Sequence, residues 1–234
     1  MTSLSDKILS AQTVHGIAPH DVKYDFSSIA GVLKARADDE RTWMIYYDEQ
    51  NNRTEAFFKA FVERVRQTAG LLKASGLKRG DRIATAAHNH PDTIVQYFAA
   101  WMLGACAVPL NMTEDDARIS YILQNSRAKL VFCREEYSAK IEALLKTDVL
   151  KEKALKIIPV YNDESRDGGF HELLKGVEMV EFPEGDMLDD ECLIVYTSGT
   201  TGNPKGVVLV QRNLFADGTS IAAWHGIDAT QRMM

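Results

Sequence analysis

Thr197-Ser198-Gly199-Thr200-Thr201-Gly202-Asn203-Pro204-Lys205-Gly206 is a hydroxyl-rich and glycine-rich stretch between two apolar runs, residues 193–196 and 207–210. Apolar runs interrupted by such a cluster predict two strands joined by a loop. Glycine lets backbone amides approach a ligand closely. Successive exposed amides form an anion-binding concavity, and a lysine adds a mobile positive charge. The loop is therefore predicted to hold a polyphosphate.

This loop differs from the common P-loop of nucleotide-binding proteins. That motif has four residues between its first glycine and a Gly-Lys pair, then Ser or Thr, and a helix follows. Here Lys205 lies between Pro204 and Gly206, and a β-branched run comes next. Because no helix follows the lysine directly, backbone amides, hydroxyl groups and Lys205 must supply the binding.

The bulk properties exclude several other classes of protein. The 234 residues are 45% hydrophobic and 26% charged, as in a globular protein with a sizeable core. The net charge of −6 argues against a nucleic-acid-binding surface. The N-terminal residues show no signal-peptide pattern. The longest apolar stretch, residues 97–110, is too short to span a bilayer.

The three cysteines, Cys106, Cys133 and Cys192, each lie in an apolar stretch and lack the spacing of metal ligands. We expect them to be buried free thiols. Their number and context favour a reducing compartment, and thus a cytoplasmic location.

The middle of the chain alternates between strand and helix patterns. Strands are expected at residues 82–86, 107–110, 130–133 and 157–160. Helices are expected at residues 92–103 and 138–150, and another from a Thr113 cap to about residue 125, with Asp116 at the capping-box position. Repeated βα units predict an α/β fold with a mostly parallel, doubly wound sheet flanked by helices.

Shorter elements are expected on either side of this core. Ser27 is predicted to cap a helix that reaches about residue 37, and residues 43–47 and 48–52 are expected to form a strand and a hairpin turn. A helix with apolar positions between residues 58 and 72 is expected to end at Gly76. A short helix is expected at residues 171–174, after an exposed loop at 162–169.

Three parts are predicted along the chain. Residues 1–25 form an N-terminal arm, residues 26–185 a first α/β subdomain, and residues 186–234 the beginning of a second subdomain. The second part would start a second sheet that carries the phosphate-binding hairpin, reached through an acidic connection at residues 184–191. A last helix is expected at 213–225, with an apolar side formed by Leu214, Ile221 and Trp224. Because no closing segment follows, we expect an incomplete N-terminal domain.

The strand–loop–strand pattern from Tyr196 to Gly206 resembles the phosphate-binding signature of the adenylate-forming superfamily of AMP-dependent synthetases and ligases. This superfamily includes acyl-CoA synthetases, adenylation domains of peptide synthetases and firefly luciferase. Residues 61–83, with Gly80-Asp81-Arg82 near their end, and residues 101–111 also resemble recurrent segments of acyl-CoA synthetases. The resemblance thus covers most of the chain.

The resemblance implies a two-step reaction. A small-molecule carboxylic acid attacks the α-phosphate of Mg²⁺-ATP, which releases pyrophosphate and leaves an acyl-adenylate; the thiol of coenzyme A then displaces AMP. The residues implied to bind the ATP phosphates are Thr197, Ser198, Gly199, Thr200, Thr201, Gly202 and Lys205. Lys205 would also stabilise charge on the departing pyrophosphate.

The resemblance also implies a longer enzyme. The segments that bind adenine, ribose, Mg²⁺ and most of the acyl group, together with a hinge and a catalytic lysine of a C-terminal domain, would lie beyond Met234. We therefore expect the parent protein to be a ligase and the 234-residue chain alone to be inactive.

Other possible sites in the sequence are weaker. His88 and His90 are interpreted as the loop before a helix, and Asp189-Asp190 as a solvated acidic pair. No metal-ligand pattern or hydrolase motif is present.

Two further functions stay open at this point. One is a non-catalytic nucleotide-binding or interaction protein that kept the fold, and the other is a peptide-synthetase-type adenylation domain. The sequence does not choose among carboxylic acids, although family frequency favours a fatty or other apolar acid. The acceptor thiol and the oligomeric state are also not specified.

Overall fold

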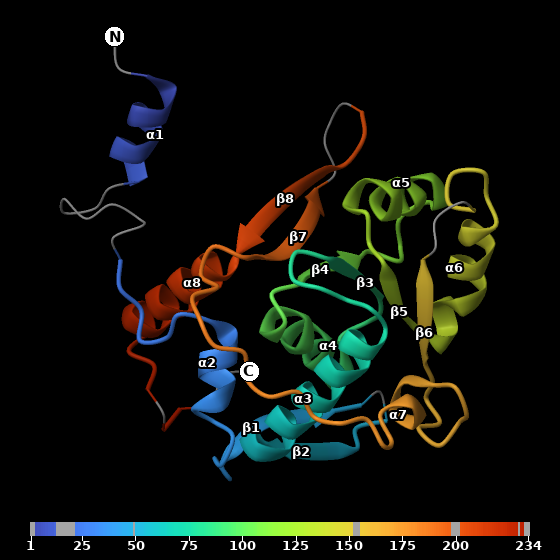
Figure 1. Cartoon of the computed structure of the whole chain (residues 1–234), viewed down its shortest axis with the longest axis horizontal. Helices are drawn as coiled ribbons and strands as arrows, with labels where there is room; N and C mark the ends of the chain where they lie inside the picture. Colours follow the sequence, from blue (N-terminus) through green and yellow to red (C-terminus); the bar gives the residue numbers. More distant parts are fainter. Residues whose placement is uncertain are drawn as a thin grey trace.

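A computed structural model describes residues 3–12, 22–48, 50–151, 155–197, 202–228 and 230–231. Its centre is a six-stranded sheet with the strand order β6-β5-β3-β4-β7-β8 (Figure 1). The strands are β3 (Arg82–Ala86), β4 (Cys106–Leu110), β5 (Leu130–Arg134), β6 (Lys156–Val160), β7 (Glu191–Thr197) and β8 (Lys205–Val210). All neighbouring pairs are parallel except β7 and β8, which are antiparallel. The predicted α/β class with a mostly parallel sheet is confirmed.

Helices cover both faces of this sheet. The helices α3 (Phe58–Ala74) and α4 (Pro91–Met102) share one apolar cluster with the sheet, and α5 (Asp116–Ser126) and α6 (Ser138–Leu145) share the other. Successive strand residues point to opposite faces, so Ile83 packs in the first cluster and Ala84 in the second. The central strands are therefore buried on both sides, which explains their continuous apolar runs.

Smaller elements complete the described chain. They are the helices α1 (Leu4–Gln12), α2 (Ile29–Lys34), α7 (Phe170–Leu173) and α8 (Gln211–His225), the 3₁₀ helix η2 (Glu135–Tyr137), and the strands β1 (Thr42–Tyr47) and β2 (Arg53–Phe57). The strands β1 and β2 form a separate antiparallel hairpin, as predicted. Gly76 follows the end of α3 with φ +86°, a conformation that favours glycine. Among the described residues, no helix combines the length and apolarity needed to cross a bilayer.

Side-chain caps place two helix starts one or two residues away from the predicted positions. α2 is capped by Ser28 and not by Ser27, because the Ser28 Oγ accepts the Gly31 N–H at 3.1 Å. α5 is capped by Asp115, whose carboxylate accepts the Arg118 N–H at 2.8 Å. Thr113 instead donates its hydroxyl to Asn111 Oδ1, and Asp116 is the first helical residue. These two cap predictions were wrong because several adjacent Ser, Thr and Asp side chains can all act as caps.

Four further expectations need correction. α2 ends at Lys34 and not near residue 37. α6 ends at Leu145 and not at residue 150, and just after that end the Thr147 hydroxyl donates to the carbonyl of Leu144 at 2.6 Å. The phosphate-binding hairpin does not start a second sheet, since β7 pairs with β4 in the same sheet. On α8, Leu214 packs against the core as expected, but Ile221 is exposed and Trp224 is 86% exposed, so the described residues cover the expected apolar side only in the first part of the helix. The division at residues 185/186 stays a prediction.

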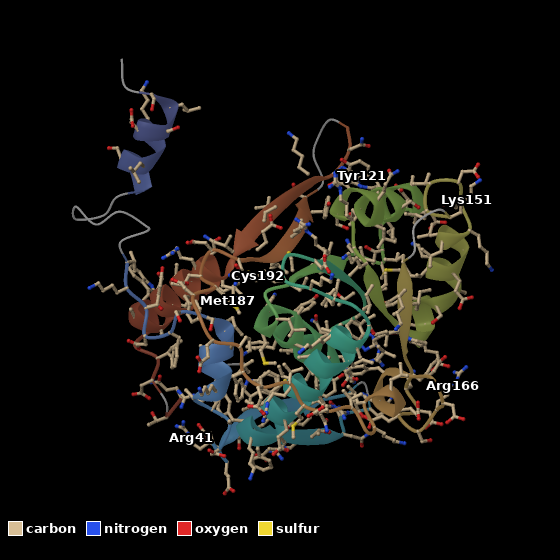
Figure 2. The ribbon with its side chains drawn as sticks, in the orientation of Figure 1. Arg41, Tyr121, Lys151, Arg166, Met187 and Cys192 are labelled. Carbon is tan, nitrogen blue, oxygen red and sulfur yellow. The ribbon has the colours of Figure 1, made fainter. Side chains whose placement is uncertain are left out.

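The cysteine prediction agrees with the structure. Cys106, Cys133 and Cys192 are buried free thiols, and Cys192 lies inside the molecule while Lys151 and Arg166 lie at its periphery (Figure 2). Burial raises the pKa of the Cys106 and Cys192 thiols to about 12 and that of the Cys133 thiol to about 11. All three groups are therefore protonated at neutral pH.

Three arginine side chains form ion pairs with the acidic residues at and just before the start of β7. Arg79 pairs with Asp190 at 2.7 Å, Arg82 with Glu191 at 2.6 Å, and Arg212 with Asp189 at 2.9 Å. Farther upstream, Arg66 Nε donates to the carbonyl of Val180 at 2.9 Å. The acidic segment is thus bound at the start of β3 and to α8, and the residues just before it are bound to α3, so it is not a free linker.

Gln211, the first residue of α8, is fully buried and joins several elements. Its Oε1 accepts the Ile29 N–H at 2.8 Å, and its Nε2 donates to the Trp101 carbonyl at 3.0 Å. Trp101 in turn donates its indole N–H to the carbonyl of Cys192 in β7. This network connects α2, α4, β7 and α8 through one side-chain amide.

Replacing Gln211 by Leu tests this network. The change keeps the volume but leaves the Ile29 N–H and the Trp101 carbonyl without their partner, so we expect the free energy of unfolding to fall by about 2–4 kcal/mol. Urea denaturation measures this loss. The exposed Gln50→Leu variant in the β1–β2 turn serves as control, with a change below about 0.5 kcal/mol. Equal stability of the two variants would contradict the proposed role.

Gly70 in α3 offers a second test of packing. A Cβ there would lie 2.3 Å from the Glu178 carbonyl oxygen, whereas a Cβ at Gly218 in α8 would meet nothing within 4 Å. We therefore expect Gly70→Ala to cost about 1–3 kcal/mol of stability. Gly218→Ala should gain up to about 1 kcal/mol from helix propensity. Thermal unfolding compares both variants, and stabilisation by both would show that the 177–180 segment does not pack on α3.

Candidate functional site

The strands β7 and β8 bring the two ends of the predicted phosphate loop together. Thr197 and Lys205 are register partners at the loop end of the hairpin, and the Thr197 hydroxyl donates to the Lys205 carbonyl at 3.4 Å. The Lys205 side chain is exposed. Gly202 has φ +98°, a backbone conformation that L side chains rarely adopt. Ser198, Gly199, Thr200 and Thr201, also predicted to bind phosphate, lie outside the described residues.

Gly206 is required by packing within the hairpin. It is the register partner of Tyr196, and a Cβ at Gly206 would lie 3.1 Å from Tyr196 Cζ and 2.9 Å from Ile194 Cγ2. The aromatic ring therefore occupies the space that a side chain at position 206 would need. Gly206, the last glycine of the motif, thus leaves room for the Tyr196 ring. Thr197 and Lys205 form the next register pair toward the loop.

Tyr196 also connects the hairpin to α5. Its hydroxyl donates to Asn125 Oδ1 at 2.6 Å, across 71 positions of sequence. Burial, followed by the nearby Tyr121, raises the pKa of the Tyr196 phenol, so it stays protonated and able to donate at neutral pH. The hydrogen bond and the ring contact with Gly206 together fix the orientation of β7 where it enters the loop.

A cleft of about 260 Å³ opens beside the hairpin. It lies where β4 and β7 end, and residues from α5 form its other wall. Its polar lining groups outside the hairpin are Asn111, Glu114 and Arg118. Arg118 pairs with Glu114 at 3.2 Å, so this cation is partly compensated. Pro204 from the loop also lines the cleft and is itself buried.

Sequence reasoning missed Asn111 and Arg118 as members of this cleft. Asn111 directly follows β4, and ligands of open α/β sheets bind at the carboxyl ends of the strands. That rule could have identified Asn111 once β4 was assigned. Arg118 could not be found in this way, because its place beside Thr197 depends on β7 lying next to β4.

The other sequence candidates take structural roles. His90 Nδ1 accepts the Asp92 N–H at 3.2 Å at the start of α4, which confirms the predicted helix-start loop. His88 bonds Glu136 at 2.7 Å. Asp189 is exposed as predicted, but Asp190 is only 17% exposed and paired with Arg79. Within the described ranges, no three His, Cys, Asp or Glu side chains form a group that could hold a metal ion.

The family model and the curated relatives that match this chain point to the same protein family. Residues 33–234 match the family model of the AMP-binding enzymes. A feruloyl-CoA synthase from an Amycolatopsis species is 33% identical over 161 residues, which are 69% of this chain and 29% of that protein. The 2-succinylbenzoate–CoA ligase of Bacillus velezensis is 30% identical over 209 residues, or 87% of this chain and 37% of that protein.

A solved structure extends the match to three dimensions. The fatty acyl CoA synthetase of Mycobacterium tuberculosis superimposes with a TM-score of 0.71 and 25% identity, over 84% of this chain and 37% of that chain. The present chain spans about a third of the length of these relatives. The sheet, the hairpin and the family match together show that the chain belongs to the AMP-binding enzyme family, as an N-terminal portion of an adenylate-forming, acyl-CoA-synthetase-like protein.

Proposed function

We propose that the intact protein is an ATP-dependent carboxylic acid:CoA ligase. The observation that carries this proposal is the β7–β8 hairpin, whose loop ends, Thr197 and Lys205, meet beside a cleft at the carboxyl edge of a parallel sheet. The names of the two relatives, a feruloyl-CoA synthase and a 2-succinylbenzoate–CoA ligase, favour coenzyme A as acceptor over a carrier protein. They also favour a ligase over a non-catalytic binding protein.

In the first step, a carboxylate oxygen of the substrate bonds to the α-phosphorus of ATP. The bond from that phosphorus to the bridging oxygen breaks, and pyrophosphate leaves. Loop amides and the hydroxyls of Thr197, Ser198, Thr200 and Thr201 bind the β- and γ-phosphate oxygens, and Gly199 and Gly202 allow the backbone to approach them. Lys205 stabilises the charge that develops on the departing pyrophosphate.

In the second step, the thiol sulfur of coenzyme A bonds to the acyl carbon and releases its proton to solvent, and AMP leaves with the electron pair of the broken anhydride bond. The ATP that enters carries Mg²⁺, and no residue of this chain is assigned to that ion. The three buried thiols support a cytoplasmic location. We also propose that residues 26–185 and 186–234 belong to two subdomains.

Lys205→Gln tests the proposed role of the lysine. Removing the cation that faces pyrophosphate should lower the rate of acid-dependent ATP–pyrophosphate exchange about 10²–10³-fold in the intact protein. The Lys59→Gln variant on α3 removes the same charge away from the hairpin and should keep the wild-type rate. A panel of aromatic, fatty and short-chain acids is used for the measurement. Unchanged exchange in Lys205→Gln would refute the role of the lysine, and absence of exchange with every acid in wild type would refute the ligase proposal.

The bond between Tyr196 and Asn125 gives a second test, on loop positioning. Tyr196→Phe keeps the ring over Gly206 and removes only the hydroxyl, so we expect a severalfold rise in the KM for ATP with an intact fold. Asn125→Ala should have a similar effect, and the double variant should be no worse than either single one. Exchange kinetics at varied ATP concentration measure this coupling. Additive effects of the two changes would show that the hydrogen bond does not position the loop.

A further inference from the structure

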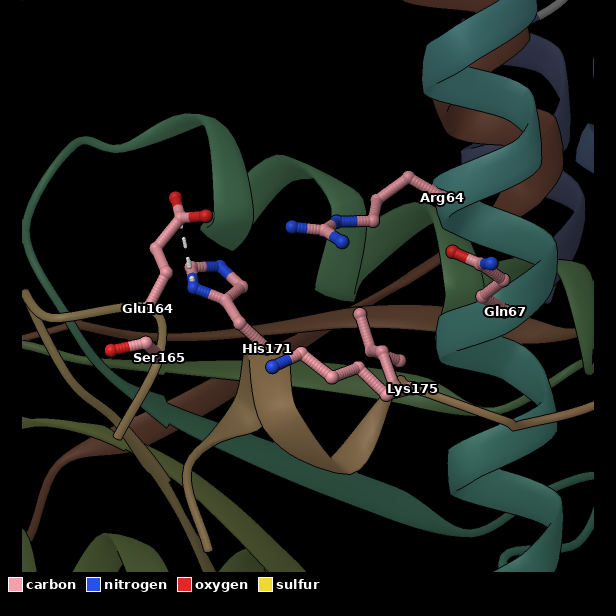
Figure 3. A pocket seen from close by; sticks show the side chains of 7 residues that line it. Arg64, Gln67, Glu164, Ser165, His171 and Lys175 are labelled. Carbon is pink, nitrogen blue, oxygen red and sulfur yellow. Dashed lines mark ion pairs between the residues drawn. The ribbon is translucent and has the colours of Figure 1, made fainter. Parts of the chain in front are cut away.

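An open cavity of about 350 Å³ lies between α3 and α7 (Figure 3). Both helices lie away from the β7–β8 hairpin (Figure 1). Arg64 and Gln67 line the cavity from α3. His171 lines it from α7, and Lys175, which also lines it, is the residue that follows the C-cap of α7. Glu164, from the loop that follows β6, stands at the rim of the cavity. The adenylation chemistry proposed above uses none of these groups.

The imidazole of His171 is fixed at the base of the cavity. Its Nε2 lies 2.9 Å from Asp92 Oδ2, and both side chains are buried. Burial by itself raises the pKa of Asp92, but the hydrogen bond from His171 and the nearby His90 together outweigh it and the pKa is lowered, so Asp92 is ionised and accepts. Nε2 therefore carries the hydrogen, and Nδ1 is the ring atom that faces the loop, 3.7 Å from Glu164 Oε1.

The cavity has more hydrogen-bond donors than acceptors. In the part of the chain that the structure describes, no hydrogen bond or ion pair engages the side chains of Arg64, Gln67 or Lys175. Arg64 reaches toward the imidazole from α3, and Lys175 extends beneath the same ring (Figure 3). Among the described residues that line the cavity, Glu164 is the only carboxylate; it is 69% exposed and stands beyond hydrogen-bond distance of Nδ1. A ligand rich in acceptor oxygens would satisfy these donors.

We propose that this cavity binds a phosphate group, either as the free dianion or as the monoester end of a small metabolite. The guanidinium of Arg64 supplies a planar fork, the ammonium of Lys175 a point charge, and the Gln67 amide a further donor. The His171 ring, held by Asp92, forms the base of the site, and Glu164 swings aside to admit the ligand. The cavity volume falls in the range of small-molecule sites, so it leaves room for an organic body beside the phosphate.

The experiment is a calorimetric titration of the full chain with inorganic phosphate at fixed ionic strength, with chloride as the matched salt. It is run in the Lys205→Gln background, so that phosphate bound at the hairpin loop does not contribute. Arg64→Gln and Lys175→Gln should each weaken binding about tenfold, because each removes a charge-assisted bond. Glu164→Gln should strengthen binding severalfold, because it removes a like charge from the rim.

The control is Lys73→Gln, which removes an exposed cation from the same helix outside the cavity and should leave the affinity unchanged. Thermal unfolding without phosphate checks that each variant is folded. A parallel titration with glycerol 3-phosphate distinguishes a monoester from the free ion, and tighter binding of either supports the site. The proposal is overturned if phosphate does not bind above the chloride blank, or if the Arg64, Lys175 and Glu164 variants all bind as tightly as their parent.

Discussion

The buried side-chain amide of Gln211 is the interaction on which the attachment of the β7–β8 hairpin most depends. β7 joins the parallel sheet through the pair Ala107–Leu193, so the described ladder between β4 and β7 is short. The ion pairs of Asp189, Asp190 and Glu191 lie near the surface, where such pairs contribute roughly 0–1 kcal/mol each. A buried amide with both ends bonded is more costly to lose, because its removal leaves two desolvated partners. The position of the candidate site therefore rests on a residue outside the phosphate motif.

Within the hairpin, one aromatic side chain relates the motif to the rest of the fold. Tyr196 lies over Gly206 on the neighbouring strand and donates to Asn125 on α5. The contact with Gly206 fixes how closely β7 and β8 pack next to Thr197 and Lys205. The hydrogen bond to Asn125 fixes the position of the hairpin relative to α5. Glycine in this signature consequently has two different physical uses. Gly202 supplies a left-handed backbone, and Gly206 makes room for a ring.

The carboxyl edge of the parallel strands explains why polar groups gather at two places in this protein. At the β4 and β7 ends, Asn111 and Thr197 meet the residues of α5 around the hairpin cleft. After the end of β6, the loop that contains Glu164 leads into α7, and these residues line the cavity of about 350 Å³ together with α3. In both places the strands bring the backbone to one edge, and the loops that leave it carry the side chains that define the chemistry.

The sequence by itself determined the elements whose signals are local. The strand at residues 82–86, the apolar runs around the glycine-rich loop and the burial of the three cysteines follow from composition and periodicity over short windows. Caps were predicted less well, because neighbouring Ser, Thr and Asp residues offer equivalent local bonds. Only the tertiary structure decided that the hairpin continues the first sheet, that Arg118 and Thr197 line one cleft and that Arg64 and Lys175 line one cavity. These relations join residues far apart in the chain, such as Gln211 and Ile29 at a separation of 182 positions, and local propensity carries no information about which distant surfaces will pack together.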